Sequence, residues 1–562
     1  MPSPKKFTSP FTVKLNGSPL SEADIQRIVS VRVDQDLNIP DMFTITLHDV
    51  RHEPGQKRAT VFGILDDDTF AIGAKVNISA GRGAPPQEFF IGEITSLELE
   101  AGKDGDARAV VRGYDGSHRL HRERKSRSFL NQSDSDIARK IAQEANLQPD
   151  VEATSQVYDY VFQDNHTNWE FLVDRANRIG YEVFVIDRTL HFRRPPQVQR
   201  PIDLELGENL LSLHVRLGVP GQTKEVVVKG WDPKTKREIV GRASSSQAAP
   251  QIGERRSADQ LGQRFGAAKL VLTNQPVYTQ AEADNLAQSV LDEITAGFIQ
   301  LEGMCLGDPR LKPGSRVRLQ GMGRRFSGEY YISSATHMIT AEGYTTSFVV
   351  SGRRPNSILG LLSSNGQAGK NGASGKHTGV VVGVVTNNQD SDNLGRVKVK
   401  FPWLADDESH WARLASPMAG KGRGMLFVPE VGDEVLVAFE QGDIHHPYVI
   451  GSVWNGTDQP PLAASEAVGG TGKVKQRIIK TRTGHKIIID DDDAGAGGGI
   501  TIVDKDEKNK IKLDAAGSGK LTIDVKGDLE INAVGNIKIK GTTVEMTATG
   551  PLKVKGATID LN

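Results

Sequence analysis

The last fifth of the chain contains no aromatic residue. Among 19 Phe, 5 Trp and 9 Tyr, the last is Trp454, and none occurs in residues 455–562. Aromatic side chains dominate the cores of globular domains because each buries ~150–250 Å². So long a stretch without them indicates either a core too narrow to hold a ring or a disordered tail.

A repeat within this stretch argues against disorder. Apolar residues spaced by two positions recur at steps of 8, 8, 7, 8 and 7 residues. The pairs are Leu521/Ile523, Leu529/Ile531, Ile537/Ile539, Val544/Met546, Leu552/Val554 and Ile559/Leu561, and looser ones precede them at Ile487/Ile489, Ile500/Ile502 and Ile511/Leu513. This alternation predicts short strands with one apolar face. One such ribbon cannot bury its apolar face alone, so we predict an intertwined fibre built from several copies.

Residues 377–455 read as a small β-barrel of the oligonucleotide/oligosaccharide-binding (OB) kind. Six short alternating strands are predicted, among them Gly395–Phe401, Gly424–Pro429 and Asp433–Phe439. Such barrels often bind single-stranded nucleic acid through aromatic side chains in a basic groove. The candidates here are Phe401, Trp403 and Trp411 with Lys398, Lys400, Lys421 and Arg423. Acidic residues of the same domain argue against a basic groove, so a packing or interface role is favoured for these aromatics; they are Asp406, Asp407, Glu408, Glu430, Asp433 and Glu434.

Two upstream segments resemble each other at an offset of 241 residues. Gly73-Ala-Lys-Val matches Gly314-Ser-Arg-Val, and Phe89-Phe-Ile matches Tyr330-Tyr-Ile. This predicts two related β-barrels, although Gly-x-x-Val is also a common way for a strand to begin. Helices with capping boxes are predicted after Ser133, Thr167 and Thr279.

Composition and motifs argue against a catalytic or metal-binding site in this chain. The formal net charge is −1, so no bulk attraction to nucleic acid or anionic membrane is expected. Cys305 is the single cysteine, and we find no nucleophile elbow or metal-binding motif. His445-His446 could be a metal fragment, but adjacent residues of a strand point to opposite faces. Asp490–Asp493 lacks the alternating spacing of a calcium loop. We therefore expect no enzyme activity, cofactor or metal.

The order of these parts resembles the VgrG-type hub and spike proteins of contractile injection systems. The most specific stretches are Gly395-Arg-Val-Lys-Val-Lys-Phe-Pro-Trp, Pro429-Glu-Val-Gly-Asp-Glu-Val, His446-Pro-Tyr-Val-Ile-Gly-Ser-Val-Trp-Asn and Thr483-Gly-His-Lys-Ile, while Gly113-Tyr-Asp…His118-Arg-Leu is similar to phage late-control tail proteins. The short connection between barrel and fibre, and the absence of sequence after the last pair, resemble extracellular injection particles more than type VI secretion or phage spikes.

The resemblance implies a mainly β fold with an α+β insert and trimeric assembly. The expected parts are a first hub β-barrel (1–115), an α+β insert (116–202), a second related hub β-barrel with a helix (203–355), a flexible linker (356–376), an OB-fold barrel (377–455), a linker (456–475) and an intertwined triple-stranded β-helical spike (476–562). The trimer core is expected at Leu521, Ile523, Leu529, Ile531, Ile537, Ile539, Val544, Met546, Leu552 and Val554.

The resemblance also implies partners. Two related barrels in each of three chains would match a hexameric inner tube and its baseplate, and a PAAR-type tip protein would dock on Ile559, Leu561 and Asn562. Effector cargo and release of the particle from the cell are left open. Assembly in the cytoplasm is expected, because no signal peptide follows Met1, and the target membrane would be contacted only mechanically. A cell-wall or polysaccharide hydrolase and a nucleic-acid-binding protein are the alternatives.

Overall fold

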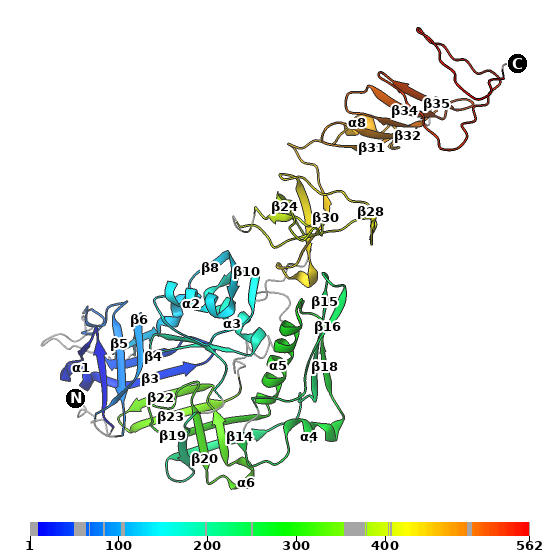
Figure 1. Ribbon diagram of the computed structural model, residues 1–562. Coiled ribbons are helices and arrows are strands. Elements are labelled where there is room, and N and C mark those ends of the chain that lie inside the picture. The colour runs from blue at the N-terminus through cyan, green and yellow to red at the C-terminus, as the bar shows by residue number, and fades with distance from the viewer. Residues whose placement is uncertain are drawn as a thin grey trace. The chain divides into compact units, whose positions relative to one another are not determined.

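A computed structural model gives the fold of the chain. It describes residues 9–49, 63–66, 68–82, 85–102, 107–196, 199–248, 251–352, 377, 379–402, 404, 407–491 and 497–560. The chain divides into two compact units, Met1–Val453 and Trp454–Asn562 (Figure 1). Within the described ranges, no helix is both long and apolar enough to cross a membrane.

Two sheets form the body of the first unit. Their strands are β1 (Phe11–Leu15), β2 (Ser18–Pro19), β3 (Ile28–Asp36), β4 (Met42–His48), β5 (Lys75–Ala80), β6 (Gln87–Ala101), β7 (Ala107–Tyr114), β13 (Ile202–Glu205), β14 (Leu210–Leu217), β17 (Gln251–Ile252), β19 (Ile299–Leu306), β20 (Arg316–Gln320), β21 (Gly328–Tyr331), β22 (Ser334–Thr340) and β23 (Gly343–Val350). One sheet has eleven strands in the order β14-β19-β23-β22-β3-β4-β7-β6-β5-β1-β2, and the other has the order β13-β20-β21-β17. Helix α1 (Glu22–Arg27) lies between β2 and β3.

The two related barrels are halves of one structure rather than separate domains. They meet where β22 pairs with β3 in antiparallel register, with Met338 opposite Arg32. Alternate residues of β4, Phe43, Ile45 and Leu47, are fully buried in the core of the first half. The sequence could not predict this junction, because pairing between strands some 300 residues apart has no local signal.

Both halves contain the same glycine turn. Gly73 has a φ of 90° and its N–H donates to the Ile94 carbonyl at 2.8 Å. Gly314 has a φ of 80° and its N–H donates to the Ile332 carbonyl at 3.0 Å. Glycine adopts such positive φ values without a steric penalty. The equivalent of Ile332 is therefore Ile94 rather than Ile91, and the sequence match of Phe89-Phe-Ile to Tyr330-Tyr-Ile is three residues out of register.

The α+β insert has its own core. It contains η2 (Gly116–His121), β8 (Arg124–Ser133), α2 (Asp134–Glu144), β9 (Gln148–Val151), β10 (Val157–Thr167), α3 (Asn168–Ile179), β11 (Glu182–Ile186) and β12 (Thr189–Arg193). The capping boxes predicted at Ser133 and Thr167 are confirmed, and α3 ends at Gly180 in the left-handed conformation. Trp169 and Leu172 on α3 pack into this core.

A long helix covers a three-stranded sheet in the second half. Helix α5 (Gln280–Ala296) begins with the predicted capping box of Thr279 and Glu282. It packs against β15 (Glu225–Asp232) and β16 (Arg237–Ala243), which form a sheet with β18 (Lys269–Leu272). Leu286 and Leu291 lie in the shared core. The smaller elements are α4 (Ala258–Gly262), η3 (Gln263–Phe265) and α6 (Gly323–Phe326).

The OB domain is a five-stranded sheet with the order β25-β24-β29-β30-β26. Its strands are β24 (Val380–Asn387), β25 (Lys398–Lys400), β26 (Arg413–Leu414), β29 (Glu434–Phe439) and β30 (Pro447–Ser452), and a small hairpin pairs β27 (Ala419–Gly420) with β28 (Arg423–Gly424). The predicted strand Gly424–Pro429 is wrong, because β28 ends at Gly424 and Met425–Val428 pair with no strand described here.

The second unit begins with an antiparallel meander. Strands β31 (Gln476–Lys480), β32 (Lys486–Asp490), β33 (Gly499–Val503), β34 (Asn509–Asp514) and β35 (Lys520–Val525) pair in sequence order, after a short helix α8 (Ala464–Ala467). From Lys526 to Asp560 every residue is described, and none lies in a helix or strand. The short strands predicted in this last part therefore do not form within a single chain.

Candidate assembly site

Two rows of apolar side chains cross the meander from strand to strand. In the first row, Ile487 lies opposite Ile502, which lies opposite Ile511, which lies opposite Ile523. Neighbouring strands lie ~4.8 Å apart, so each row is a continuous apolar stripe at right angles to the strands. In the second row, each residue pairs with the next in the order Ile489, Ile500, Leu513 and Leu521.

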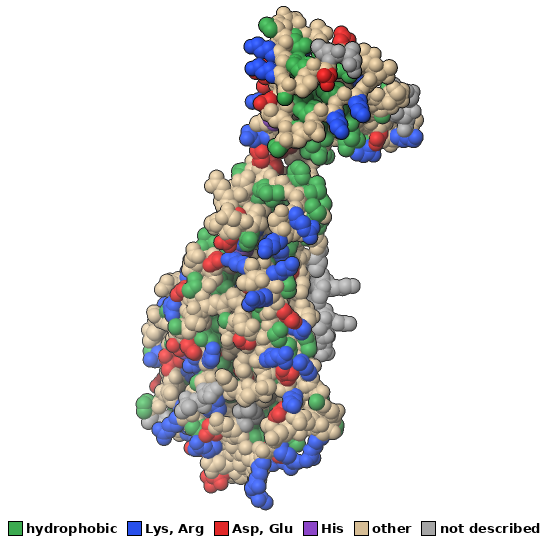
Figure 2. All heavy atoms as spheres, turned by 45° about the vertical axis from the view of Figure 1, so that its right-hand side comes forward, with side chains coloured by type: hydrophobic (Ala, Val, Ile, Leu, Met, Phe, Trp, Pro, Cys, Tyr) green, Lys and Arg blue, Asp and Glu red, His purple; other side chains and the backbone are tan. Residues whose placement is uncertain are grey.

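The chain itself does not cover these rows. Ile487 is 39 % exposed and Leu521 is 60 % exposed, although each belongs to a regular strand. A trough of about 690 Å³ follows the first row and is lined by Ile479, Ile487, Ile502, Ile511 and Ile523, among others. Figure 2 shows hydrophobic side chains gathered on the visible face of this unit. A contiguous exposed apolar surface of this kind marks a protein–protein contact.

The predicted trimer-core residues beyond the meander are also exposed. Their exposed fractions run from 50 % for Val544 to 66 % for Ile531. The others are Leu529, Ile537, Ile539, Met546, Leu552 and Val554, while Leu521 and Ile523 lie within β35. Of the predicted tip-docking residues, Ile559 is 49 % exposed, and Leu561 and Asn562 lie outside the described residues. The described ones among these positions are therefore about half exposed or more within their own chain.

A second contact, missed by the sequence analysis, joins the insert to the OB domain. Phe162 of β10 is buried in the OB core beside Phe401 and Phe439. Its backbone N–H donates to His445 Nε2 at 2.8 Å. His445 Nδ1 lies 2.6 Å from an oxygen of Asp443, so contacts on both ring nitrogens fix the orientation of the imidazole. The available signal was the spacing of Tyr158, Tyr160 and Phe162, which places three rings on one strand face.

Further polar contacts hold this junction. The Ser128 N–H donates to Asp407 at 2.7 Å, and His377 pairs with Asp164 at 2.7 Å. Tyr278 donates its hydroxyl to Glu440 and stacks on His446 at 3.8 Å between ring centroids. The OB domain is therefore fixed against the insert and the second half of the hub.

The electrostatics of the junction favour a charged Asp443. Burial opposes ionisation of this carboxyl, but the charges and hydrogen bonds of His445 and His446 outweigh burial and hold its pKa well below its usual range. Both rings approach the same carboxyl, His446 Nδ1 at 3.3 Å. The prediction that they point to opposite faces is wrong, because the two residues lie in a turn before β30 rather than in a strand.

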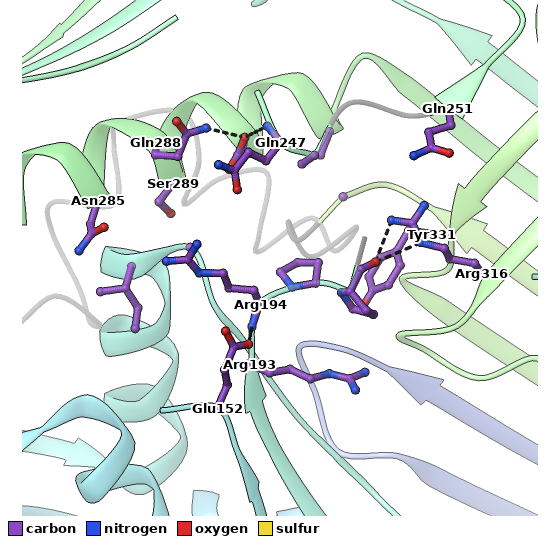
Figure 3. A pocket seen from close by; sticks show the side chains of 18 of the residues that line it. Glu152, Arg193, Arg194, Gln247, Gln251, Asn285, Gln288, Ser289, Arg316 and Tyr331 are labelled. Atoms are coloured by element: carbon purple, nitrogen blue, oxygen red, sulfur yellow. Dashed lines mark hydrogen bonds between the residues drawn. The ribbon is translucent and has the colours of Figure 1, made fainter. Parts of the chain in front are cut away.

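A cavity of about 750 Å³ lies between the insert, α5 and the second half of the hub (Figure 3). Its arginines already have partners. Arg316 donates twice to the Pro196 carbonyl, and Arg193 lies over Phe184 and 3.5 Å from Glu182. On α5, the Gln288 side chain donates to Asp292 at 3.0 Å. The lining contains no pairing of a nucleophile with a base.

Other candidate chemistry finds little support in the structure. Among the described residues, no group of three or more His, Cys, Asp or Glu could hold a metal ion. Burial raises the pKa of Cys305 to about 12, so its thiol is protonated at neutral pH. Asp492 and Asp493 of the acidic run, and Trp403 of the aromatic set, lie outside the described residues. Phe401 is buried, and Trp411 lies 5.6 Å from the cations of Arg396 and Lys398.

Comparison with protein families gives two matches. The model of the Alg8 N-terminal domain matches residues 5–341, which is more than half of the chain. The model of the type VI secretion system/phage-baseplate injector OB domain matches residues 381–454, in agreement with the OB sheet described above.

Individual relatives agree with these matches. The chain is 33 % identical over 230 residues to the type VI secretion system spike protein VgrG1c of Pseudomonas aeruginosa, covering 38 % of this chain and 31 % of that relative. It is 29 % identical over 199 residues to VgrG1a of the same organism, covering 33 % and 30 %. The matched regions thus span about a third of these curated relatives.

The fold agrees as well. A chain in a solved Francisella PdpA–VgrG complex superposes with a TM-score of 0.52 at 10 % identity, covering 92 % of this chain and 80 % of that chain. The matches over residues 5–341 and 381–454 lead to one conclusion: the chain belongs to the family of the Alg8 N-terminal domain, carries an injector OB domain of the type VI secretion system/phage-baseplate kind, and is similar over part of its length to VgrG spike proteins.

Proposed function

We propose that this protein is the trimeric central hub and spike of a contractile injection machine. In this role it joins a hexameric inner tube to a puncturing tip and is driven through a target envelope. The observation that carries the proposal is the pair of exposed apolar rows on the meander, whose apolar spacing continues into residues 526–560, a described segment that lies in no helix or strand. A trimer supplies the missing walls.

Three copies can close the rows into a narrow prism. Each layer contributes two apolar side chains per chain, so six meet around the axis. Burying a Leu or Ile side chain contributes about 1.5–3 kcal/mol, so the stabilisation grows with every layer. No aromatic ring is needed, which agrees with the composition after Trp454. A shaft stabilised along its whole length is stiff, as a puncturing element must be.

The two halves of the hub support the proposed contact with the tube. Each chain carries the same glycine turn twice, at Gly73 and Gly314, so a trimer presents six similar elements. A six-fold ring can dock on six such elements, although the spike itself has three-fold symmetry. We further propose that a PAAR-type tip protein covers the fibre end at Ile559, Leu561 and Asn562, with baseplate proteins around the hub.

Mechanical action is proposed in place of catalysis. The relatives are spike proteins of injection machinery, and the cavity of Figure 3 holds no catalytic constellation. The relatives' names come from type VI secretion, and the proposal covers the role of a spike that contractile injection systems share.

Light scattering on the full chain tests the proposal. The expected mass is three times 61.0 kDa. Ile539→Asp should abolish the trimer or sharply lower its melting temperature, because it places three carboxylates in the same layer of the buried trimer core. Burying each carboxylate costs several kcal/mol after relaxation. Lys538→Asp is the matched control, since it places the same side chain on the alternate face one residue earlier. A monomeric wild-type chain, or an unchanged trimer for Ile539→Asp, refutes the assignment.

A further inference from the structure

The OB domain carries an exposed apolar segment that its own core does not use. After β28, the side chains of Met425, Leu426, Phe427 and Val428 are 45 %, 79 %, 65 % and 37 % exposed. Val431, just beyond Pro429, is 60 % exposed. We call residues 425–431 the apolar loop. Single exposed apolar residues are ordinary on protein surfaces, but four in succession mark a contact.

Hydrogen bonds hold the apolar loop in place. The Met425 N–H donates to the Met418 carbonyl at 3.0 Å, and the Ser416 hydroxyl donates to the Met425 carbonyl at 2.6 Å. At the other end, the Asn388 side chain donates to the Pro429 carbonyl at 3.2 Å. The loop is therefore anchored at both ends while its side chains stay exposed.

The surface around the loop extends its apolar character. Met418, whose carbonyl holds the loop, is 45 % exposed. Leu394 is 54 % exposed, and a Cβ at its neighbour Gly395 would lie 3.7 Å from the Leu426 side chain. The nearby charges are of both signs, from Lys421, Arg423 and Glu430. Identical surfaces with mixed charge do not repel one another strongly, so this patch is compatible with a second copy of itself.

The distribution of the exposed side chains indicates contact on more than one side. In a segment that lies flat on one partner, some of four successive side chains face their own domain and are buried. Here each of the four is at least 37 % exposed, so none is buried against its own domain and each keeps surface free for a partner. A copy in a three-fold ring has a neighbour on each side, which is the arrangement that covers such a loop.

We propose that the apolar loop is a contact between copies of this chain, in which it packs against the OB domains of the two neighbouring copies. This inference rests on the proposed trimer. Residues 454–475 connect the OB domain to the meander. When three chains share one fibre core, this connection therefore keeps their three OB domains at a high effective concentration. The contact then holds the trimer together at a second level, independent of the fibre rows.

Engineered cysteines test the contact directly. Cys305 is the single cysteine and is fully buried, so an introduced thiol is the only accessible one. In full-length Leu426→Cys and Phe427→Cys, a short bismaleimide should link copies into covalent dimers. Phe265→Cys is the control, because Phe265 is 85 % exposed on η3, away from the OB domain. In the assembled protein, a bulky polyethylene-glycol maleimide should label positions 426 and 427 at least tenfold more slowly than position 265.

The outcomes separate this inference from the proposed function. A trimer by light scattering with cross-linking at 426 or 427, but none at 265, supports the contact. A trimer in which both loop thiols react as fast as the control and do not cross-link overturns the contact and leaves the spike proposal standing. A chain that is monomeric before any cross-linking overturns both.

Discussion

Replacing one buried carboxyl should make the hub more stable at alkaline pH. Asp115 follows β7, caps η2 and is 3 % exposed. One of its oxygens accepts hydrogen bonds from the Ser117 hydroxyl at 2.6 Å and the Ser117 N–H at 3.3 Å, whereas the other oxygen has no hydrogen-bond partner. Burial raises the pKa of Asp115 to about 7. The pKa of neighbouring Asp41 is raised well above its usual range, first by burial and then by the charge of Asp115.

The direction of this pH dependence of stability follows from where Asp115 binds its proton. The folded chain keeps a proton on Asp115 up to about pH 7, while the unfolded chain releases it near pH 4. The folded state therefore loses stability as the pH rises between these values and stays destabilised above them. Three pKa units correspond to about 4 kcal/mol at pH 8. Asp115→Asn removes the charge and keeps an acceptor for Ser117, so we expect a gain of about 2–4 kcal/mol at pH 8 and little change at pH 4.

Urea unfolding of the full chain at pH 5 and pH 8 measures this difference. The unfolding midpoint of the wild type should fall between the two pH values, and that of Asp115→Asn should fall less. Asp68→Asn, at an exposed position on η1 (Asp68–Phe70), is the control and should follow the wild type. If Asp115→Asn is less stable than the wild type at pH 8, the ionised carboxylate is needed in the fold and the reasoning is wrong.

Three further predictions concern the first unit. Asp134→Ala should lower the free energy of unfolding in urea by about 3–5 kcal/mol, because it leaves the buried Arg175, which pairs with Asp134 at 2.6 Å, without its counter-ion. A loss below about 1 kcal/mol would contradict this. Phe162→Ala should cost about 3–5 kcal/mol and raise hydrogen exchange in β29 and β30, since its ring fills the OB core; unchanged exchange would show that the junction does not hold the OB domain. Gly73→Ala should lower the free energy of unfolding by about 1–2 kcal/mol, because the φ of Gly73 is 90°. Gly218→Ala, at a position without positive φ, should lower it less, and equal losses would contradict the strain argument.

Features encoded by short-range patterns could be predicted from the sequence. The capping boxes at Ser133, Thr167 and Thr279 formed as expected, because each depends on side chains three residues apart. The period-two pairs also located the strands of the meander, where Ile511 and Leu513 occupy β34. The assignment of the later pairs to a trimer core remains a prediction.

Features that depend on distant pairing could not be predicted. The joining of β3 to β22 and the insertion of Phe162 into the OB core each bring together residues far apart in the sequence. The strand predicted at Gly424–Pro429 failed for a related reason. Its apolar residues resembled a core strand, but periodicity cannot tell a surface that faces the domain's own core from one that faces another molecule.

The difference between the two units bears on how such a spike could assemble. Phe43, Trp169 and Phe348 are buried within their own chain, so the hub can form its cores before meeting a partner. In the fibre, by contrast, Ile531 and Ile539 remain about two-thirds exposed in a single chain. In the proposed trimer their burial comes from association, which ties the stability of the proposed shaft to the presence of all three copies. On this proposal, a chain without its partners keeps a folded hub and forms no shaft.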